Sequence, residues 1–347
     1  MITINIDIFN LNKTFIIAEL SANHMNDFDI AVKTIEAIAE SGADAVKFQT
    51  FTPDTITIDC DNEYFQIKQG TIWDGQVLHD LYEEAYMPWD WQPKLKKIAE
   101  DLGLIAFSSP FDKTAVDFLE DMDMEIYKIA SYEINDIPLI EYVASKGKPI
   151  ILSTGIASLE DIELAIQTCL DAGNDQIAIL KCTSSYPTPF DEINLNTIKS
   201  LKERFNVTVG LSDHTLGSEV SIAGVALGAK IVEKHFILDR NMDTPDAEFS
   251  MNPEEFKSMV SQIRNVEKSL GSSNFEVTEK MKINQDFSRS LFVVKDMKKG
   301  ETITEEFVRS IRPGFGLHTK YLKDILGKKV NMDLEKGTPF ELDFVEN

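Results

Sequence analysis

The sequence predicts an α/β fold: a (β/α)8 TIM barrel followed by a small, mostly-β C-terminal domain. Eight short apolar runs each end in charged or hydroxyl residues, and the stretches between them have helical periodicity. The runs do not alternate apolar and polar residues, which favours strands buried on both faces of a parallel sheet. Eight strand–helix repeats are typical of a closed barrel. The predicted strands are Phe15–Leu20, Ala45–Thr50, Leu104–Ser109, Ile126–Ser131, Pro149–Thr154, Ile177–Ser184, Val207–Asp213 and Lys230–Phe236.

The segments after these strands carry helix start and stop signals. Apolar residues recur with helical spacing over Asp27–Ser41, and Gly42 then ends the predicted helix. Ser158 begins another helix with acidic residues in its first turn, where the helix dipole favours negative charge. Asn252 followed by Pro253 begins a third. The order of strands and helices is therefore the one that a barrel requires.

The stretch Pro53–Trp91 breaks this rhythm directly after the second strand. It is long and rich in aromatic residues, which argues against disorder, and long loops within compact domains are usually functional. We interpret it as a lid or as a wall of a substrate site. A contact between subunits is the alternative.

The two ends of the chain depart from the barrel pattern. The first eight residues alternate polar and apolar side chains, which predicts an N-terminal hairpin and does not fit a signal peptide. A Gly/Ser-containing stretch near Gly271 ends the barrel, and short runs with Gly and Pro turns follow Arg289. We expect a barrel domain over 1–275 that includes the hairpin, a linker over 276–288 and a C-terminal domain over 289–347.

Composition excludes several classes of protein. The net charge is −24, so neither nucleic acid nor an anionic membrane surface is an expected partner. No segment approaches the ~20 apolar residues that cross a bilayer. The three cysteines lack CxxC spacing, which predicts reduced thiols and a cytoplasmic location. An anionic substrate would need a locally basic site, which lysines near the strand ends could supply (Lys47, Lys128, Lys181 and Lys234).

Two histidines follow neighbouring strands of the predicted barrel. His214 comes after the seventh strand and His235 ends the eighth, so both imidazoles could reach one divalent ion that keeps open positions for substrate or water. Either histidine alone would more often be a structural hydrogen-bonding residue. Two nitrogen ligands with oxygen donors suit Mn²⁺, Co²⁺ or Zn²⁺.

Carboxylates and hydroxyls also gather at the predicted strand ends, where barrel enzymes carry their chemistry. Glu133 could relay protons, or it could form an ion pair with Lys128, and its spacing favours neither. Glu19 has the same two interpretations. Arg312 stands before Pro-Gly in the C-terminal domain, where its guanidinium could bind carboxylate or hydroxyl groups or make a surface ion pair. Hydroxyls that could hold phosphate or carboxylate oxygens occur at Ser109, Ser153 and Ser212.

These residues and their neighbours resemble the sialic acid synthase family. The likeness runs in order along essentially the whole chain and ends in what resembles the antifreeze-like (SAF) domain around Arg312-Pro-Gly. The segments that carry it are Phe15-Ile-Ile-Ala-Glu-Leu-Ser-Ala-Asn-His, Val46-Lys-Phe-Gln-Thr, Tyr127-Lys-Ile-Ala-Ser-Tyr-Glu, Ile151-Leu-Ser-Thr-Gly, Cys182-Thr-Ser-Ser-Tyr-Pro-Thr-Pro, Gly210-Leu-Ser-Asp-His-Thr and Glu233-Lys-His-Phe.

The resemblance implies condensation of phosphoenolpyruvate with an N-acylated amino-hexose to give a nine-carbon 2-keto acid and phosphate. It implies a divalent cation on His214 and His235, Mn²⁺ foremost with Mg²⁺ or Co²⁺ as alternatives, and a domain-swapped homodimer in which Arg312 comes from the partner. Glu133 would be the acid/base, with Lys128, His214 and His235 also catalytic. Substrate-binding roles would fall to Glu19, Asn23, Lys47, Gln49, Ser109, Ser131, Ser153, Lys181, Ser184, Tyr186, Ser212, Asp246 and Arg312.

Within the family, the residues after the first strand and the stretch from Trp73 to Trp91 most resemble the pseudaminic acid branch. That branch implies 2,4-diacetamido-2,4,6-trideoxy-altrose as the sugar, and the precursors of legionaminic or N-acetylneuraminic acid are the alternatives. One position departs from the family pattern, because Ser184 stands where the members that form N-acetylneuraminate have Asn. This difference favours a different sugar.

Two hypotheses of other kinds remain open. A Schiff-base aldolase could use Lys128 or Lys181, but it would leave the histidine pair unexplained. A non-catalytic sugar-binding barrel would keep the fold without turnover. The presence of His214, His235, Glu133 and Lys128 together argues against it.

Overall fold

The computed structural model describes residues 12–68 and 70–346, so the predicted N-terminal hairpin lies outside the described residues. The chain divides into two compact units, Met1–Gly271 and Ser272–Asn347, which are described here one at a time.

The first unit confirms the predicted barrel. Eight parallel strands pair in sequence order and close where β1 meets β8, with Glu19 opposite both Lys47 and His235. Two strands end earlier than predicted. The fourth was predicted to reach Ser131, but Ser131 begins a 3-10 turn. The sixth was predicted to reach Ser184, but it ends at Lys181. The strands are β1 Phe15–Glu19, β2 Ala45–Thr50, β3 Ile105–Pro110, β4 Tyr127–Ile129, β5 Ile150–Ser153, β6 Ile177–Lys181, β7 Thr208–Ser212 and β8 Ile231–His235.

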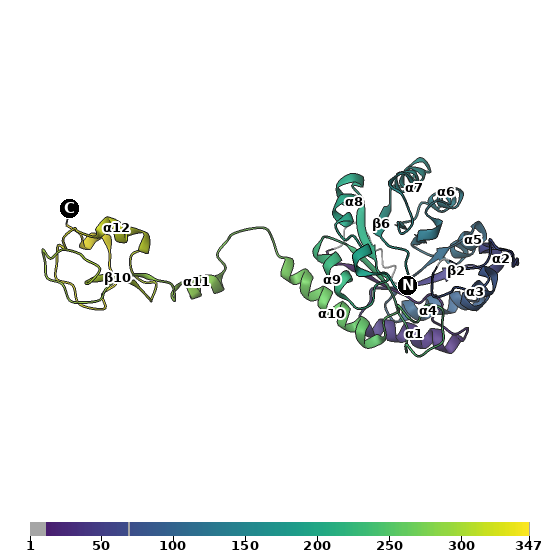
Figure 1. Cartoon of the computed structure of the whole chain (residues 1–347), viewed down its shortest axis with the longest axis horizontal. Coiled ribbons are helices and arrows are strands. Elements are labelled where there is room, and N and C mark those ends of the chain that lie inside the picture. The colour runs from purple at the N-terminus through teal and green to yellow at the C-terminus, as the bar shows by residue number, and fades with distance from the viewer. Residues whose placement is uncertain (1–11, 69, 347) are drawn as a thin grey trace. The chain divides into compact units, whose positions relative to one another are not determined.

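Helices surround this barrel and begin at the signals that the sequence contains (Figure 1). Asp27 caps α1 by accepting hydrogen bonds from two backbone N–H groups, and Gly42 ends it at φ 84°, a conformation that glycine adopts readily. Ser158 and Asn252 cap α7 and α10, and each side chain accepts a hydrogen bond from one backbone N–H group. The helices are α1 Phe28–Ser41, α2 Pro53–Ile56, α3 Leu78–Ala85, α4 Gln92–Asp101, α5 Lys113–Asp121, α6 Ile137–Ala144, α7 Leu159–Asp171, α8 Thr197–Phe205, α9 Glu219–Ala226 and α10 Pro253–Leu270.

Side chains of alternate parity along each strand separate two hydrophobic cores. The outer core lies between strands and helices and includes Ile16, Val46, Ile179 and Val232. The inner core fills the barrel, as in other eight-stranded barrels. It consists of Phe15, Ile17, Ala45, Ile105, Phe107, Ile126, Ile151, Ala178, Leu180 and Ile231.

The segment between β2 and β3 is folded rather than open. It contains α2 and α3, and residues 65–67 pair with residues 76–78 through an antiparallel bridge and backbone hydrogen bonds of 2.9 Å. Trp89 stacks on Phe118 at 4.8 Å, and Trp91 packs edge-on against Phe28 at 5.7 Å. These two tryptophans therefore attach the segment to the barrel's outer helices.

The second unit is small and irregular around its own core. It contains one antiparallel two-stranded sheet, β9 Ser290–Val293 with β10 Val308–Ile311, and several isolated bridges. Helix α11 Glu279–Gln285 lies within the segment predicted as a linker, and the following Asp286 accepts a hydrogen bond from Gly314 N. A second helix, α12, spans Leu322–Ile325. The part of the chain that the structure describes has no helix of the length and apolarity needed to cross a membrane.

Candidate active site

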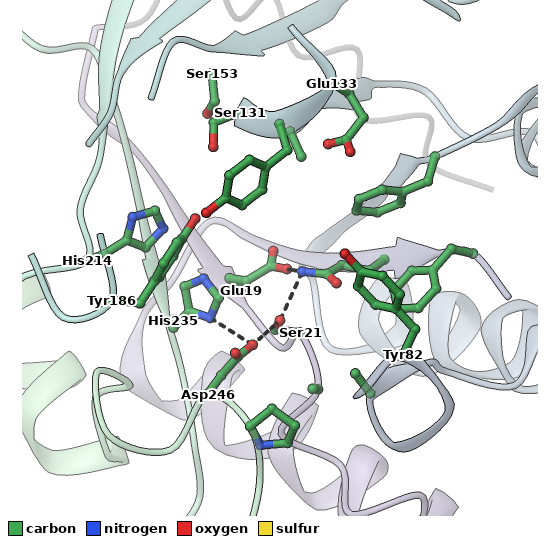
Figure 2. A pocket seen from close by; sticks show the side chains of 18 of the residues that line it. Glu19, Ser21, Tyr82, Ser131, Glu133, Ser153, Tyr186, His214, His235 and Asp246 are labelled. Atoms are coloured by element: carbon green, nitrogen blue, oxygen red, sulfur yellow. Dashed lines mark hydrogen bonds and ion pairs between the residues drawn. The ribbon is translucent and has the colours of Figure 1, made fainter. Parts of the chain in front are cut away.

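A cavity of about 470 Å³ opens at the carboxyl ends of the barrel strands. This is the face at which barrel enzymes bind their substrates. Figure 2 shows His214, His235 and Tyr186 on one side of it and Tyr82 on the other. The predicted site residues that line the cavity are Glu19, Lys47, Gln49, Lys128, Ser131, Glu133, Ser153, Tyr186, Ser212, His214, His235 and Asp246.

Strand parity explains why most of these side chains meet. Ile17 belongs to the apolar core inside the barrel, and Glu19, two residues further along β1, points to the same interior. The same step of two residues leads from Ala45 to Lys47 and from Ile151 to Ser153. The cavity is therefore the continuation of the barrel interior beyond its apolar layer.

Four buried charges form the floor of the cavity. Lys47 Nζ lies 2.6 Å from Glu19 Oε2 and 3.8 Å from Glu233 Oε2, and Lys128 Nζ lies 3.6 Å from Glu233 Oε1. Lys128 also donates to Ser153 Oγ at 2.7 Å, and Ser212 Oγ donates to Glu233 at 3.1 Å. The two lysines are at most 5% exposed, so a bound anion would meet them with little screening by water.

These charges shift one another's pKa values. Burial raises the pKa of Glu19 to about 7, although Lys47 opposes the shift. Against the effect of burial, Lys128 and Lys47 lower the pKa of Glu233. Burial lowers the pKa of Lys128, and Glu233 opposes it. Glu233 is therefore the carboxylate that stays ionised between the two lysines.

Glu133 sits above this floor on the 3-10 turn that follows β4. Its Oε2 atom is buried and has no hydrogen-bond partner among the described residues. Burial raises the pKa of Glu133 to about 7, and the positive charge of Lys128 opposes the shift. A carboxyl with such a pKa can both give and take a proton near neutral pH.

The surroundings of His214 and His235 fit a divalent cation. Their rings lie 5.3 Å apart, and His235 Nδ1 is buried without a hydrogen-bond partner, with Asp246 Oδ2 at 3.6 Å. Burial lowers the pKa of His214 to about 4 and that of His235 well below its usual value, so both imidazoles are neutral. Within the described residues no group of three or more His, Cys, Asp or Glu side chains could hold a metal. A cation on the two imidazoles would need water or substrate as its further ligands.

A chain of polar side chains links the carboxyl group of Asp246 to the charged floor. Ser21 Oγ donates to Asp246, and Gln49 Nε2 donates to Ser21 Oγ and to Glu19 Oε1, each at 2.9 Å (Figure 2). Burial raises the pKa of Asp246, and the hydrogen bond from Ser21 opposes this shift. These four hydrogen-bonded side chains place an amide, a hydroxyl and two carboxyl groups where a sugar could bind them.

Four predicted residues of the barrel unit lie outside the lining of the cavity. The Asn23 amide donates to Phe236 O and Ser250 Oγ and accepts a hydrogen bond from Thr244 Oγ1. Ser109 Oγ accepts a hydrogen bond from Lys47 Nζ at 3.4 Å. Lys181 has the parity of the outer core and donates to Thr183 Oγ1 at 2.8 Å.

Ser184, the fourth of these residues, stands beside the lining residue Ser131, and their hydroxyls are 2.6 Å apart. Gly155 leaves room for this contact, because a Cβ there would lie 2.1 Å from Ser184 Oγ. Arg312 belongs to the second unit, where it follows β10 and precedes Pro313.

Several lining residues were not assigned to the site from the sequence. Glu233 is the most important of them. It lies two residues after Ile231 and two before His235, so all three side chains are on the same side of β8, and this spacing could have identified it from the sequence. Cys182 follows Leu180 with the same spacing. Ser21 and Phe249 come from loops, whose side-chain directions have no such periodicity.

A fully buried ion pair supports the loop of His214 from behind. Lys234 Nζ lies 3.1 Å from Asp213 Oδ2, and both side chains are 0% exposed. Asp213 also accepts hydrogen bonds from the backbone and hydroxyl of Thr215 and from Ser221 Oγ. Lys234 donates to Thr215 O at 2.6 Å. The backbone on both sides of His214 is thereby fixed to β8.

The fold and the site define a barrel enzyme whose cavity contains two buried lysines beside two histidines of lowered pKa. The chain belongs to the NeuB family, whose model matches residues 34–275, and a SAF domain matches residues 288–346. Both matches confirm the resemblance to sialic acid synthases.

Curated relatives cover nearly the whole chain. It is 46% identical to the pseudaminic acid synthase of Campylobacter jejuni subsp. jejuni over 95% of this chain and 96% of that protein. The pseudaminic acid synthase of Helicobacter pylori is 45% identical over 95% of this chain and 97% of its own. The N,N'-diacetyllegionaminic acid synthase of Campylobacter jejuni is 38% identical over 92% of this chain and 96% of its own.

A solved structure gives the same fold. The N-acetylneuraminic acid synthetase of Leptospira borgpetersenii, crystallised in complex with citrate, matches with a TM-score of 0.70 and 31% identity, covering 78% of this chain and 90% of that one.

Proposed function

We propose that the chain is a pseudaminic acid synthase, a transferase that condenses phosphoenolpyruvate with 2,4-diacetamido-2,4,6-trideoxy-altrose to give pseudaminic acid and phosphate. The observation that carries this proposal is the buried floor of the cavity, where Lys47 and Lys128 stand beside two neutral imidazoles. A compact anion with a phosphate and a carboxylate suits two desolvated lysines. The names of the relatives supply the product, pseudaminic acid, and the family resemblance implies the sugar.

The lysines and hydroxyls bind and orient phosphoenolpyruvate in this proposal. Lys47 and Lys128 balance its negative charge, the hydroxyls of Ser131 and Ser153 donate to its oxygens, and Ser212 lines the same part of the cavity while it donates to Glu233. Glu233 keeps both lysines in place through its two carboxylate oxygens. The enol carbon is then held facing the part of the cavity next to Glu19 and Asp246, where the sugar binds.

The reaction forms one carbon–carbon bond and breaks one carbon–oxygen bond. Carbon 3 of phosphoenolpyruvate attacks the aldehyde carbon of the open-chain sugar, whose oxygen takes up a proton. Water adds to carbon 2 and loses a proton, and cleavage of the bond between carbon 2 and the phosphate oxygen then releases phosphate and leaves the keto group. Glu133 exchanges protons with the reacting oxygens, a role that suits a carboxyl with a pKa of about 7.

His214 and His235 would hold a divalent cation, Mn²⁺ foremost with Mg²⁺ or Co²⁺ as alternatives. When bound, such a cation would polarise the aldehyde oxygen of the sugar as a Lewis acid. Asp246 and Tyr186 line the cavity beside these histidines, and with Glu19 they orient the sugar in this proposal.

Phosphate release from phosphoenolpyruvate in the presence of Mn²⁺ tests the proposal. Three sugars are compared: the diacetamido-trideoxy-altrose, the corresponding diacetamido-mannose and N-acetylmannosamine. Turnover confined to the altrose compound and abolished by EDTA is the expected result. Preference for another sugar would keep the family and overturn the pseudaminic assignment. No turnover by folded, metal-loaded protein would favour the sugar-binding barrel.

We further propose a homodimer in which Arg312 of one copy completes the site of the other, as the family resemblance implies. Mixing Arg312→Ala with Glu133→Ala tests it, because a shared site restores part of the activity in verified heterodimers. Heterodimers that stay inactive would overturn the arrangement. We place the reaction in the cytoplasm, where the free thiols of Cys60, Cys169 and Cys182 would stay reduced.

One observation favours a second candidate, the Schiff-base aldolase. Burial lowers the pKa of Lys128, which would make its amine more nucleophilic. Glu233, whose Oε1 lies 3.6 Å from that amine, opposes the shift and favours the cationic form, which suits anion binding better. Inactivation by borohydride with substrate, together with indifference to EDTA, would support the aldolase.

A further inference from the structure

One wall of the cavity is apolar, and most of it comes from the segment between β2 and β3. We call this wall the apolar lobe. Three of its side chains are well buried, with exposed fractions of 2% for Phe51, 6% for Ile67 and 8% for Leu81. The lobe consists of Phe51, Ile56, Ile67, Leu78, Leu81 and Phe111.

The lobe is held in a defined shape by the fold of its segment. Phe51 packs edge-on against Phe111 at 5.2 Å and against Tyr82 at 5.7 Å. Ile67 and Leu78 sit on the short antiparallel pairing, in which Ile67 N donates to Gln76 O at 2.9 Å. Trp89 Nε1 donates to Phe51 O at 3.0 Å and attaches the start of the segment to its end. A preorganised wall can select the shape of a ligand at low entropic cost.

The lobe differs in chemistry from the rest of the cavity. Its six side chains carry no hydrogen-bond donor or acceptor, whereas the floor below Glu133 consists of charges and hydroxyls. Tyr82 borders the lobe, and Figure 2 places it across the cavity from His214 and Tyr186. Burial raises the pKa of Tyr82 to about 12, so its hydroxyl stays neutral. A hydroxyl group of a ligand placed against the lobe would lose its hydrogen bonds to water.

We propose that the apolar lobe is the subsite for the methyl-bearing end of the sugar and selects a 6-deoxy sugar over its 6-hydroxy counterpart. This inference rests on the proposed function. A 2,4-diacetamido-2,4,6-trideoxy sugar has a methyl group at carbon 6 where an ordinary hexose has a hydroxymethyl group. An apolar pocket rejects an added hydroxyl by up to about 10²-fold, so the lobe supplies a moderate selectivity.

The test compares two sugars that differ only in the hydroxyl at carbon 6, with phosphate release as the readout. The variants are Ile56→Asn and Leu78→Asn, which place an amide in the lobe at two half-buried positions on different helices. We expect the ratio of kcat/KM for the 6-deoxy sugar over the 6-hydroxy sugar to fall about tenfold in each. The KM for phosphoenolpyruvate should not change, because its proposed ligands are on the floor.

Ile58→Asn is the matched control, since Ile58 belongs to the same segment, is 58% exposed and does not line the cavity. It should leave the ratio unchanged. An unchanged ratio in both lobe variants, with circular dichroism showing that they fold, would overturn the inference and leave the proposed function intact. A wild-type protein without preference between the two sugars would do the same. Absence of turnover with any sugar would overturn the proposed function and this inference together.

Discussion

The barrel interior has two layers with opposite chemistry, although the same strands build both. The lower layer is apolar and includes Ile17, Phe107 and Ile231, each 0% exposed. Two residues further along the same strands, the upper layer contains charged side chains such as Glu19 and Glu233. Burial of a large apolar side chain stabilises the fold by about 1.5–3 kcal/mol, whereas burial of an ion costs several kcal/mol before it is paired. The lower layer thus stabilises the fold, whereas the upper layer decreases the stability and provides the groups for binding and catalysis.

Removal of the ionisable group of Glu133 should have the largest effect on activity. Glu133→Gln keeps the size of the side chain but can no longer exchange a proton, so we expect kcat to fall about 10²–10⁴-fold. Steady-state phosphate release measures the change. Glu84→Gln, at an exposed position on α3, is the control and should be fully active. Activity of Glu133→Gln close to that of wild type would remove Glu133 from the acid/base role.

Substitutions in each layer should separate stability from binding. Phe107→Ala in the lower layer should cost about 3–5 kcal/mol in free energy of unfolding, because a large side chain leaves a cavity. Its KM for phosphoenolpyruvate should change little. Lys128→Met in the upper layer should raise that KM at least tenfold with a smaller loss of stability, because Lys47 Nζ, 3.8 Å from Glu233 Oε2, still pairs with the carboxylate that Lys128 leaves. Urea unfolding and phosphate release measure the two quantities, and equal stability losses in both variants would contradict the division.

The ion pair behind the upper layer should matter nearly as much for stability. Lys234→Met leaves the carboxylate of Asp213 buried and unpaired, which should cost about 3–5 kcal/mol. The double variant with Asp213→Asn should recover part of the loss. Lys97→Met is the control, since its pair with Asp101 is 72% and 65% exposed and should contribute at most about 1 kcal/mol. Similar decreases in the free energy of unfolding for Lys234→Met and Lys97→Met would show that the buried ion pair stabilises the fold no more than the exposed one.

The sequence predicted the upper layer as far as strand periodicity reaches. Apolar runs that contain Glu19, Lys47 and Lys128 located the barrel, its catalytic face and most of the charged floor. Parity applied along β6 and β8 would also have selected Cys182 and Glu233 for the cavity and assigned Lys181 to the outer side. Periodicity was therefore the main signal for residues on strands, although Ser109 has the inward parity of Phe107 and does not line the cavity.

Periodicity gave no help for the segment between β2 and β3. The sequence suggested an aromatic wall up to Trp91, but the cavity receives mainly aliphatic side chains from this segment, with Trp73 and Tyr82. Trp89 and Trp91 pack on the outer helices instead. In a loop, long-range contacts decide which side chains face the cavity, and those contacts are not local properties of the sequence.

The pH dependence of stability should show the energetic cost of a carboxyl group above the charged floor. Burial raises the pKa of Glu133 from 4.5 to about 7, so between these values the folded protein binds a proton that the unfolded chain has already lost. The stabilisation is fully present below pH 4.5, decreases as the pH rises towards 7 and is lost above it. A shift of this size corresponds to about 3 kcal/mol. Glu19, whose pKa is also raised to about 7, contributes in the same direction.

Glu133→Gln separates the contribution of Glu133 from that of Glu19. The free energy of unfolding, measured in urea at several pH values from 5 to 8 with EDTA present, should decrease less steeply with pH in this variant than in wild type. EDTA keeps any effect of divalent cations out of the comparison. Parallel curves of unfolding free energy against pH for the two proteins would mean that burial does not raise the pKa of Glu133 and would contradict this prediction.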